Sequence, residues 1–193
     1  MGTHSPVREW VLAAQSEVAE LVKKVQAIQT SAPLELLVLM EIVNLKDRLD
    51  YVPELVKLHF DAWGYLQPEE DLDQRMARMT QMCRASHMPR IFIALDAGTL
   101  IGSAGIKATD ALLPDLDLTP WLMGVYVKAQ YRSRGIAAML VSHVEQIALD
   151  MDFSVLHLCT HDHEAYYRKL GYEILHTRES AGEMISIMVK QLR

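Results

Sequence analysis

Residues 125 to 137 read VYVKAQYRSRGIA, and this segment tells more about the structure than any other part of the chain. It begins with Val125 to Val127, an apolar and aromatic run that is typical of a strand. Polar and basic residues follow from Lys128 to Arg134, and a periodic apolar pattern starts at Ile136. The segment therefore predicts a strand that enters a basic turn and leads directly into a long helix.

This predicted turn has the chemistry of an anion-binding site. The first N–H groups of a helix have no partner inside it, and the helix dipole adds partial positive charge there. Gly135 and the small Ala137 leave room for a phosphate group near the backbone, and Arg132 and Arg134 add guanidinium groups. On these residues alone, anion binding and an ordinary basic surface turn remain open alternatives.

Two familiar nucleotide-binding turns fit the segment less well. A P-loop ends in Gly-Lys followed by Ser or Thr, and residues 125 to 137 contain no such ending. A dinucleotide-binding turn needs three glycines at fixed spacing, whereas Gly135 is the single glycine of this segment. The spacing Arg132-x-x-Gly135-x-Ala137 therefore belongs to another kind of turn.

A second informative segment follows the predicted long helix. Residues 156 to 160 read LHLCT, which predicts a strand, and residues 164 to 172 read EAYYRKLGY. The latter predicts a short helix that carries the pair Tyr166 and Tyr167 and ends at Gly171.

The rest of the chain alternates between strand and helix patterns. We expect strands at 34–45, as one strand or two joined strands, and at 90–95, 100–108, 121–128, 155–160, 172–177 and 184–189. We expect helices at 52–64, 69–85, 136–151 and 164–170. Residues 96–99 predict a hairpin turn, and residues 110–120, rich in Asp and Pro, predict a surface loop. The expected class is α/β or α+β, with a mixed, partly antiparallel central sheet flanked by helices.

The first 32 residues form a separate predicted segment. Apolar residues between Trp10 and Ile28 recur at steps of three and four, which predicts an amphipathic helix that ends before Pro33. Its apolar stripe packs either on its own domain or on a second copy of the chain in a homodimer, and both alternatives stay open. The expected division is an N-terminal helical extension, residues 1–32, and one domain, residues 33–193.

Composition narrows the class of protein. Half of the 193 residues are hydrophobic, which is enough for one domain with its own core. The net charge of -6 argues against a nucleic-acid partner and suits a cationic acceptor such as an amine. No secretory signal or membrane-spanning run is expected, and Cys83 and Cys159 lack the spacing of a disulfide or metal motif. We expect a cytoplasmic protein without a membrane partner.

The two motifs together resemble those of the GNAT superfamily of acetyl-CoA-dependent N-acetyltransferases. The spacing Arg132-x-x-Gly135-x-Ala137 is similar to the family signature Gln/Arg-x-x-Gly-x-Gly/Ala, and residues 164–172 are similar to the second family motif. In element order the resemblance extends over residues 39–192. It implies a GNAT fold with an extra N-terminal helix, and acetyl-CoA as co-substrate.

The resemblance also implies where acetyl-CoA is bound. The backbone of Val125, Tyr126 and Val127 is expected to pair with the pantetheine arm as an added strand would. The pyrophosphate is expected on the turn, which comprises Arg132, Ser133, Arg134, Gly135, Ile136, Ala137 and Ala138. Many family members have an Asn after the following strand that contacts this arm, whereas this chain reads HDH at 161–163.

The implied reaction is the attack of a primary amine, on a small molecule or at a peptide N-terminus, on the thioester. Tyr167 is the expected general acid, because the family places this Tyr beside the sulfur and its hydroxyl is protonated at neutral pH. Without the resemblance, Tyr167 is read as a half-buried core residue. A backbone N–H between Val125 and Val127 is the expected oxyanion donor, and the base stays open between Asp110, Glu41 and water.

Three other interpretations of polar and sulfur-containing residues are weaker. The three histidines of residues 157–163 do not have the spacing of a four-ligand zinc site, so no metal is expected. Cys159 is expected to be inert packing and not a covalent acetyl carrier. Met76 and Met79 lie on a helical stripe that is typical of a core, with an adaptable acceptor pocket as the alternative.

A function of a different class also fits the same motifs. A fold and a cofactor site do not guarantee turnover, so an acyl-CoA-binding regulatory module without activity is the alternative to an enzyme. Release of free CoA from acetyl-CoA distinguishes the two.

Overall fold

The computed structural model describes residues 40–180 and 182–193. The chain divides into two compact units, Met1–Met40 and Glu41–Arg193. The elements below belong to the second unit, apart from Met40 at its border. The helix expected within residues 1–32 and the strand expected at residues 34–39 lie outside the described residues.

The described part of the chain folds around one seven-stranded sheet with the order β1-β2-β3-β4-β5-β7-β6. The strands are β1 (Met40–Asn44), β2 (Arg90–Asp96), β3 (Thr99–Lys107), β4 (Trp121–Val127), β5 (Val155–Thr160), β6 (Glu173–Ser180) and β7 (Glu183–Gln191). The α-helices are α3 (Val52–Trp63), α4 (Leu72–Cys83), α5 (Ile136–Asp150) and α6 (Glu164–Lys169). Short 3₁₀ helices are η1 (Leu45–Asp47), η2 (Leu49–Tyr51), η3 (Gly64–Leu66) and η4 (Ala129–Tyr131).

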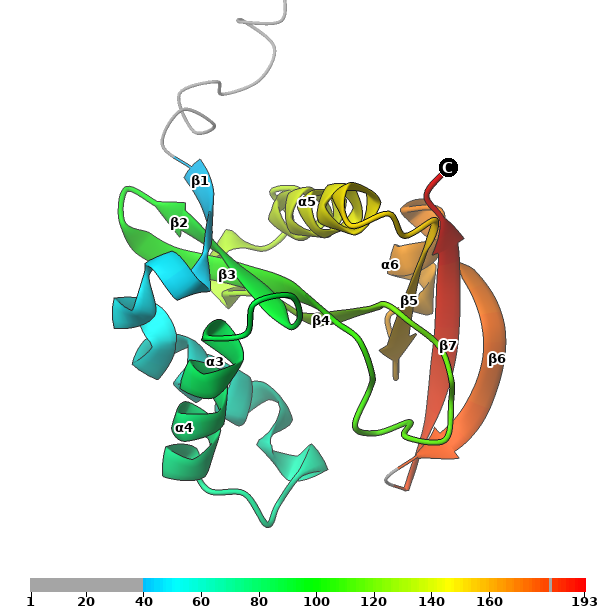
Figure 1. Ribbon diagram of the computed structural model, residues 1–193, viewed down its shortest axis with the longest axis horizontal. Helices are drawn as coiled ribbons and strands as arrows, with labels where there is room; N and C mark the ends of the chain where they lie inside the picture. The colour runs from blue at the N-terminus through cyan, green and yellow to red at the C-terminus, as the bar shows by residue number, and fades with distance from the viewer. Residues whose placement is uncertain (1–39, 181) are drawn as a thin grey trace, which may run out of the picture. The chain divides into compact units, whose positions relative to one another are not determined.

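Helices cover both faces of the sheet. Figure 1 shows α5 on one face of β2, β3 and β4, and α3 with α4 on the opposite face. Beneath α3 and α4, a buried cluster joins Leu55 and Val56 to Ile93 and Leu95 of β2. The predicted class, a mixed and partly antiparallel sheet flanked by helices, is confirmed.

The pairing of β4 with β5 is parallel and very short. The pairs β2–β3, β3–β4, β5–β7 and β6–β7 are all antiparallel and longer. The β4–β5 register holds one residue pair, Trp121 with His157, and the His157 N–H also donates to Pro120 O at 3.0 Å. At this end the fully buried Trp121 ring lies 5.7 Å from the His157 ring, between centroids, and its Nε1–H donates to Leu118 O at 2.6 Å. Figure 1 shows the two strands running in clearly different directions beyond this point. A wedge therefore opens between the C-terminal halves of β4 and β5.

A β-bulge lies in β4 next to this wedge. The antiparallel register of β3 and β4 shifts between Ser103, which pairs with Tyr126, and Gly105, which pairs with Met123. Two β4 residues, Gly124 and Val125, therefore lie opposite one β3 residue. Gly124 has a φ of +58°, and a Cβ there would lie 3.2 Å from His59 Cε1. Glycine is favoured at this position, because a side chain there would have a strained left-handed backbone conformation and would crowd His59.

The loop predicted at residues 110–120 is confirmed, because no helix or strand lies between β3 and β4. It is not confined to the surface, however, since Asp110 and Leu113 are 5% and 0% exposed. Leu113 packs with Trp121 and with Ile185 and Ile187 of β7. The Asp and Pro content predicts turns correctly, yet the loop also supplies an apolar side chain that the core between β4 and β7 needs.

Candidate active site

The turn between η4 and α5 presents free backbone donors to open space. Gly135 is the N-cap of α5, with a φ of 80° and no side-chain capping bond. A Cβ on Gly135 would meet no atom within 4 Å. The N–H groups of Ile136, Ala137 and Ala138 open the helix, where no intrahelical acceptor exists. This end of α5 can therefore accept an anion against its backbone.

The two arginines of the turn connect it to the end of β4 and to its own η4 helix. Arg132 Nε donates to Val127 O at 3.0 Å, and Arg134 Nη2 donates to Gln130 O at 3.2 Å. Arg134 also lies over the Tyr131 ring, 5.3 Å from its centroid. Because a guanidinium has five N–H donors, both side chains keep donors that can reach a phosphate.

A cavity of about 360 Å³ lies where β4 and β5 separate. From the sheet it is lined by residues 122–125 of β4 and 158–160 of β5, and Tyr167 of α6 adds to the wall. The opposite wall comes from α3, η3 and α4. Of the predicted site residues, the structure brings Val125 and Tyr167 to this cavity, and Tyr126 and Val127 continue along β4. The residues of the α5 turn are not among those that line it.

Tyr167 is suited to donate a proton or a hydrogen bond. It is 8% exposed, and its ring contacts those of Tyr166 and Tyr172 with centroids 5.4 and 5.8 Å away. Burial, with smaller contributions from Tyr166 and Cys159, raises the pKa of Tyr167 well above its usual value. The hydroxyl is therefore protonated throughout the neutral and mildly alkaline range.

The two side-chain candidates for the base lie in different places. Asp110 lines the cavity, but its Oδ2 lies 2.6 Å from Lys107 Nζ and its Oδ1 accepts from the Leu112 N–H at 2.9 Å. Both carboxylate oxygens of Asp110 are therefore engaged inside the protein. Glu41 is exposed on β1, which β2 and β3 separate from β4.

Cys159 lies beside Asp110, with 3.8 Å between its Sγ and Asp110 Oδ2. Burial first, and then the neighbouring carboxylate, raise the pKa of Cys159 to about 12. The thiol is therefore protonated and a poor nucleophile at neutral pH.

The sequence analysis missed a hydrogen-bonded chain that reaches the bulge from two other elements. His59 Nε2 lies 2.9 Å from Ser103 Oγ, and Ser103 Oγ donates to Gly124 O at 2.8 Å. Because the single hydroxyl proton goes to Gly124, His59 must donate from Nε2. Burial lowers the pKa of His59 to about 4, so the ring is neutral at physiological pH. A single His on an apolar helix gives no local signal of such a role.

This chain of hydrogen bonds sets the direction of one peptide unit. In a trans peptide the C=O and the N–H point in opposite directions. Gly124 O is directed toward Ser103 on β3, so the Val125 N–H of the same unit points away from β3. Val125 lines the cavity. The bulge therefore directs one backbone donor into the wedge.

Two kinds of feature are absent from the described residues. No three His, Cys, Asp or Glu side chains there gather closely enough to hold a metal ion. None of the helices described is long and apolar enough to cross a membrane.

Comparison with known proteins places this geometry in a family. A family model described as "Acetyltransferase (GNAT) family" matches residues 52–172, which is more than half of the chain. A search of curated protein sequences finds no match.

Solved structures with the same fold are numerous. Aminoglycoside 6'-acetyltransferase type Ii is 22% identical, covers 79% of this chain and 97% of its own, and has a TM-score of 0.62. PaiA N-acetyltransferase from Thermoplasma acidophilum, in complex with coenzyme A, is 18% identical, covers 79% and 98%, and has a TM-score of 0.60. An N-acetyltransferase from Staphylococcus aureus Mu50 is 18% identical, covers 80% and 99%, and has a TM-score of 0.62. At these identities the likeness shows the fold alone.

The neutral His59 predicts a specific loss of stability in acid. Between its usual pKa of 6.5 and about 4, the unfolded chain binds a proton that the folded protein does not. The free energy of unfolding should therefore fall as the pH drops through this window, by about 3 kcal/mol at most. His59→Gln keeps a donor for Ser103 and does not titrate, so urea melts from pH 7 to 4 should show a shallower loss. Equal slopes in both proteins would contradict a buried neutral His59.

Proposed function

We propose that this chain, which belongs to the acetyltransferase (GNAT) family, transfers the acetyl group of acetyl-CoA to a primary amine by direct attack on the thioester. The observation that carries the proposal is the wedge between β4 and β5, which leads along the open edge of β4 to the uncapped start of α5. This path offers backbone donors and acceptors first, and an anion site at its end.

In this proposal the backbone of Val125, Tyr126 and Val127 forms the edge on which the pantetheine arm lies. The turn from Arg132 to Ala138 holds the pyrophosphate, with the backbone N–H groups of α5 as donors and Arg132 and Arg134 as cations. The free space in front of Gly135 supports this assignment, because a phosphate needs that space. Acetyl-CoA supplies the activated acetyl group and the thiolate leaving group.

The bulge and Tyr167 supply the two donors that the reaction needs. The Val125 N–H points into the wedge and can stabilise the negative charge that develops on the thioester oxygen. Ser103 and His59 act as positioning residues, since they hold Gly124 O on the β3 side. Tyr167 donates to the departing thiolate. With its raised pKa, we expect its hydroxyl to act as a donor over the whole working pH range.

We assign no side chain as the base. Each carboxylate that lines the cavity, among the described residues, has a cationic or histidine partner: Asp110 with Lys107, and Asp162 with His163. The amine therefore binds in its neutral form, and water receives the proton after attack. The rate at low amine concentration should then rise with pH toward the pKa of the amine.

The wider organisation of the chain is part of the same proposal. In it, the predicted domain of residues 33–193 carries the catalysis. The free thiols of Cys83 and Cys159 suit a reducing compartment, which supports a cytoplasmic enzyme.

The first test is binding of acetyl-CoA and its dependence on Gly135. Saturating acetyl-CoA should raise the Tm by several degrees, because a ligand that binds only the folded state stabilises it. Gly135→Glu and Gly135→Gln impose the same backbone strain and nearly the same volume, but only Glu adds negative charge. We expect Glu to weaken acetyl-CoA binding at least about tenfold more than Gln, measured by calorimetry. An unchanged Tm in the wild type would refute the proposal, and binding without CoA release from any amine would favour a regulatory module.

The second test concerns proton donation to the leaving group. Tyr167→Phe removes one hydroxyl and keeps the ring, so kcat should fall about 100-fold while the Kd of CoA stays constant. Tyr166→Phe is the matched control, because it removes the hydroxyl of the adjacent, half-buried ring and should leave kcat nearly unchanged. If the two variants have the same kcat, Tyr167 is not the donor.

A further inference from the structure

We infer that the acceptor is a monoamine with an apolar body, aliphatic or aromatic, and not a polyamine or an aminoglycoside. This inference rests on the proposed function, because it concerns the acceptor side of the same cavity. It is drawn from the residues of the cavity wall that faces β4 and β5. The inferred acceptor differs from the aminoglycoside in the name of one structural neighbour, aminoglycoside 6'-acetyltransferase type Ii.

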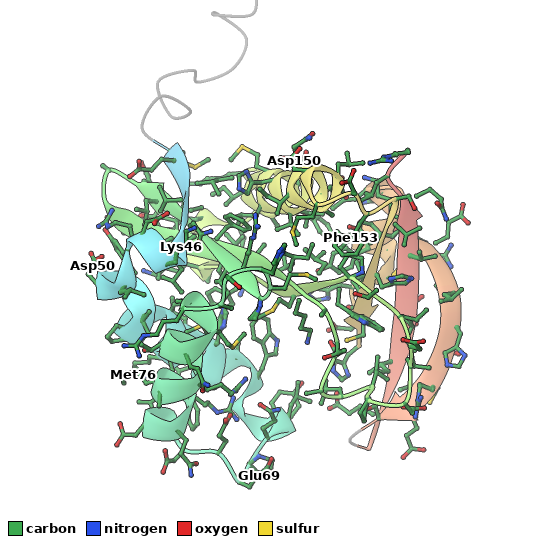
Figure 2. The ribbon with its side chains drawn as sticks, in the orientation of Figure 1. Lys46, Asp50, Glu69, Met76, Asp150 and Phe153 are labelled. Carbon is green, nitrogen blue, oxygen red and sulfur yellow. The ribbon has the colours of Figure 1, made fainter. Side chains whose placement is uncertain are left out.

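The wall opposite the sheet is predominantly apolar. Six of its side chains come from α3, η3, α4 and the loop after β3: Val56, Trp63, Leu66, Met79, Met82 and Leu112. Met79 belongs to the buried core cluster and Met76, labelled in Figure 2, packs against it, so the predicted core stripe is confirmed. Of the two, Met79 also lines the cavity. Flexible thioethers beside an indole suit an apolar ligand of variable shape.

The cationic side chains in this wall are held by partners inside the protein. Arg75 is 8% exposed and donates to the carbonyl oxygens of Gly64, Gln67 and Glu70 at 2.6–3.2 Å. Arg78 binds both carboxylate oxygens of Glu70, at 2.6 and 2.8 Å. These arginines therefore hold the η3–α4 segment in place, and they share the single carboxylate of Glu70, so this wall has no excess negative charge for a second ammonium group.

The two carboxylates that line the cavity, Asp110 and Asp162, also have partners within the protein. Asp110 is the buried one, and Lys107 and the Leu112 N–H take up both of its oxygens. Asp162 is 81% exposed beside His163, so solvent screens its charge. A second ammonium group on the acceptor would lose its water here and find no unpaired buried carboxylate among the described residues.

The size of the cavity agrees with a small acceptor. About 360 Å³ is at the lower end of the range for ligand pockets, and the thioester end of acetyl-CoA must share it. The remaining space suits an amine with a body of several carbon atoms.

The test uses two amines of equal size, n-hexylamine and 1,5-diaminopentane, which differ in a terminal methyl against a terminal ammonium. With saturating acetyl-CoA at pH 8, we expect kcat/KM to be at least about 100-fold higher for hexylamine, measured by release of free CoA. An equal or higher value for the diamine would overturn the inference. So would faster acetylation of spermidine, kanamycin or a peptide N-terminus, and these outcomes would leave the proposed acetyltransferase function intact. No binding of acetyl-CoA would instead refute the proposed function itself.

A pair of variants tests the wall directly. Leu66 lines the cavity from η3, is partly exposed and is not one of the buried core residues, so polar substitutions there should leave the fold intact. Leu66→Glu should shift the hexylamine-to-diamine ratio of kcat/KM toward the diamine at least about tenfold more than the isosteric Leu66→Gln. The same ratio in both variants would show that the acceptor does not lie against this wall.

Discussion

The separation of β4 from β5 is the constraint on which the rest of this structure depends. A central sheet normally uses all its backbone groups between neighbouring strands, and an open edge inside a sheet is costly unless something covers it. Here Trp121 and His157 close one end of the pair, and the buried indole and its bond to Leu118 O keep that end fixed. Beyond it, the edge of β4 faces the cavity, and the chain continues from this edge into the turn before α5.

The bulge and the residues that support it determine which way the Gly124–Val125 peptide points at this open edge. The extra residue in β4 would by itself leave the orientation of the Gly124–Val125 peptide undetermined. The contact from Ser103, supported by His59 on α3, turns Gly124 O toward β3 and so turns the Val125 N–H toward the wedge. Because His59 stays neutral, the support brings no charge to the place where negative charge develops in the proposed reaction. Three elements distant in sequence thus converge on one amide.

The parts of this arrangement that sequence could predict are those with a local pattern. The strand at 121–128, the turn and the helix at 136–151 agree within one residue with Trp121–Val127 and Ile136–Asp150, because apolar periodicity and Gly135 define them locally. His59 and Ser103 were missed because their partners lie 44 and 21 residues away, and neither residue type is unusual in its own segment. Leu113 shows the opposite case, in which turn-forming neighbours conceal a core residue.

The most direct test of this account is the vibration of the thioester carbonyl in bound acetyl-CoA labelled with ¹³C at that carbon. If the Val125 N–H donates to this oxygen, isotope-edited infrared spectra should show the band at lower frequency in the wild-type complex than in free acetyl-CoA. Ser103→Ala frees Gly124 O and should move the band back toward its free position while acetyl-CoA remains bound. A carbonyl band at the free position in the wild type, or one unchanged by Ser103→Ala, would contradict the account.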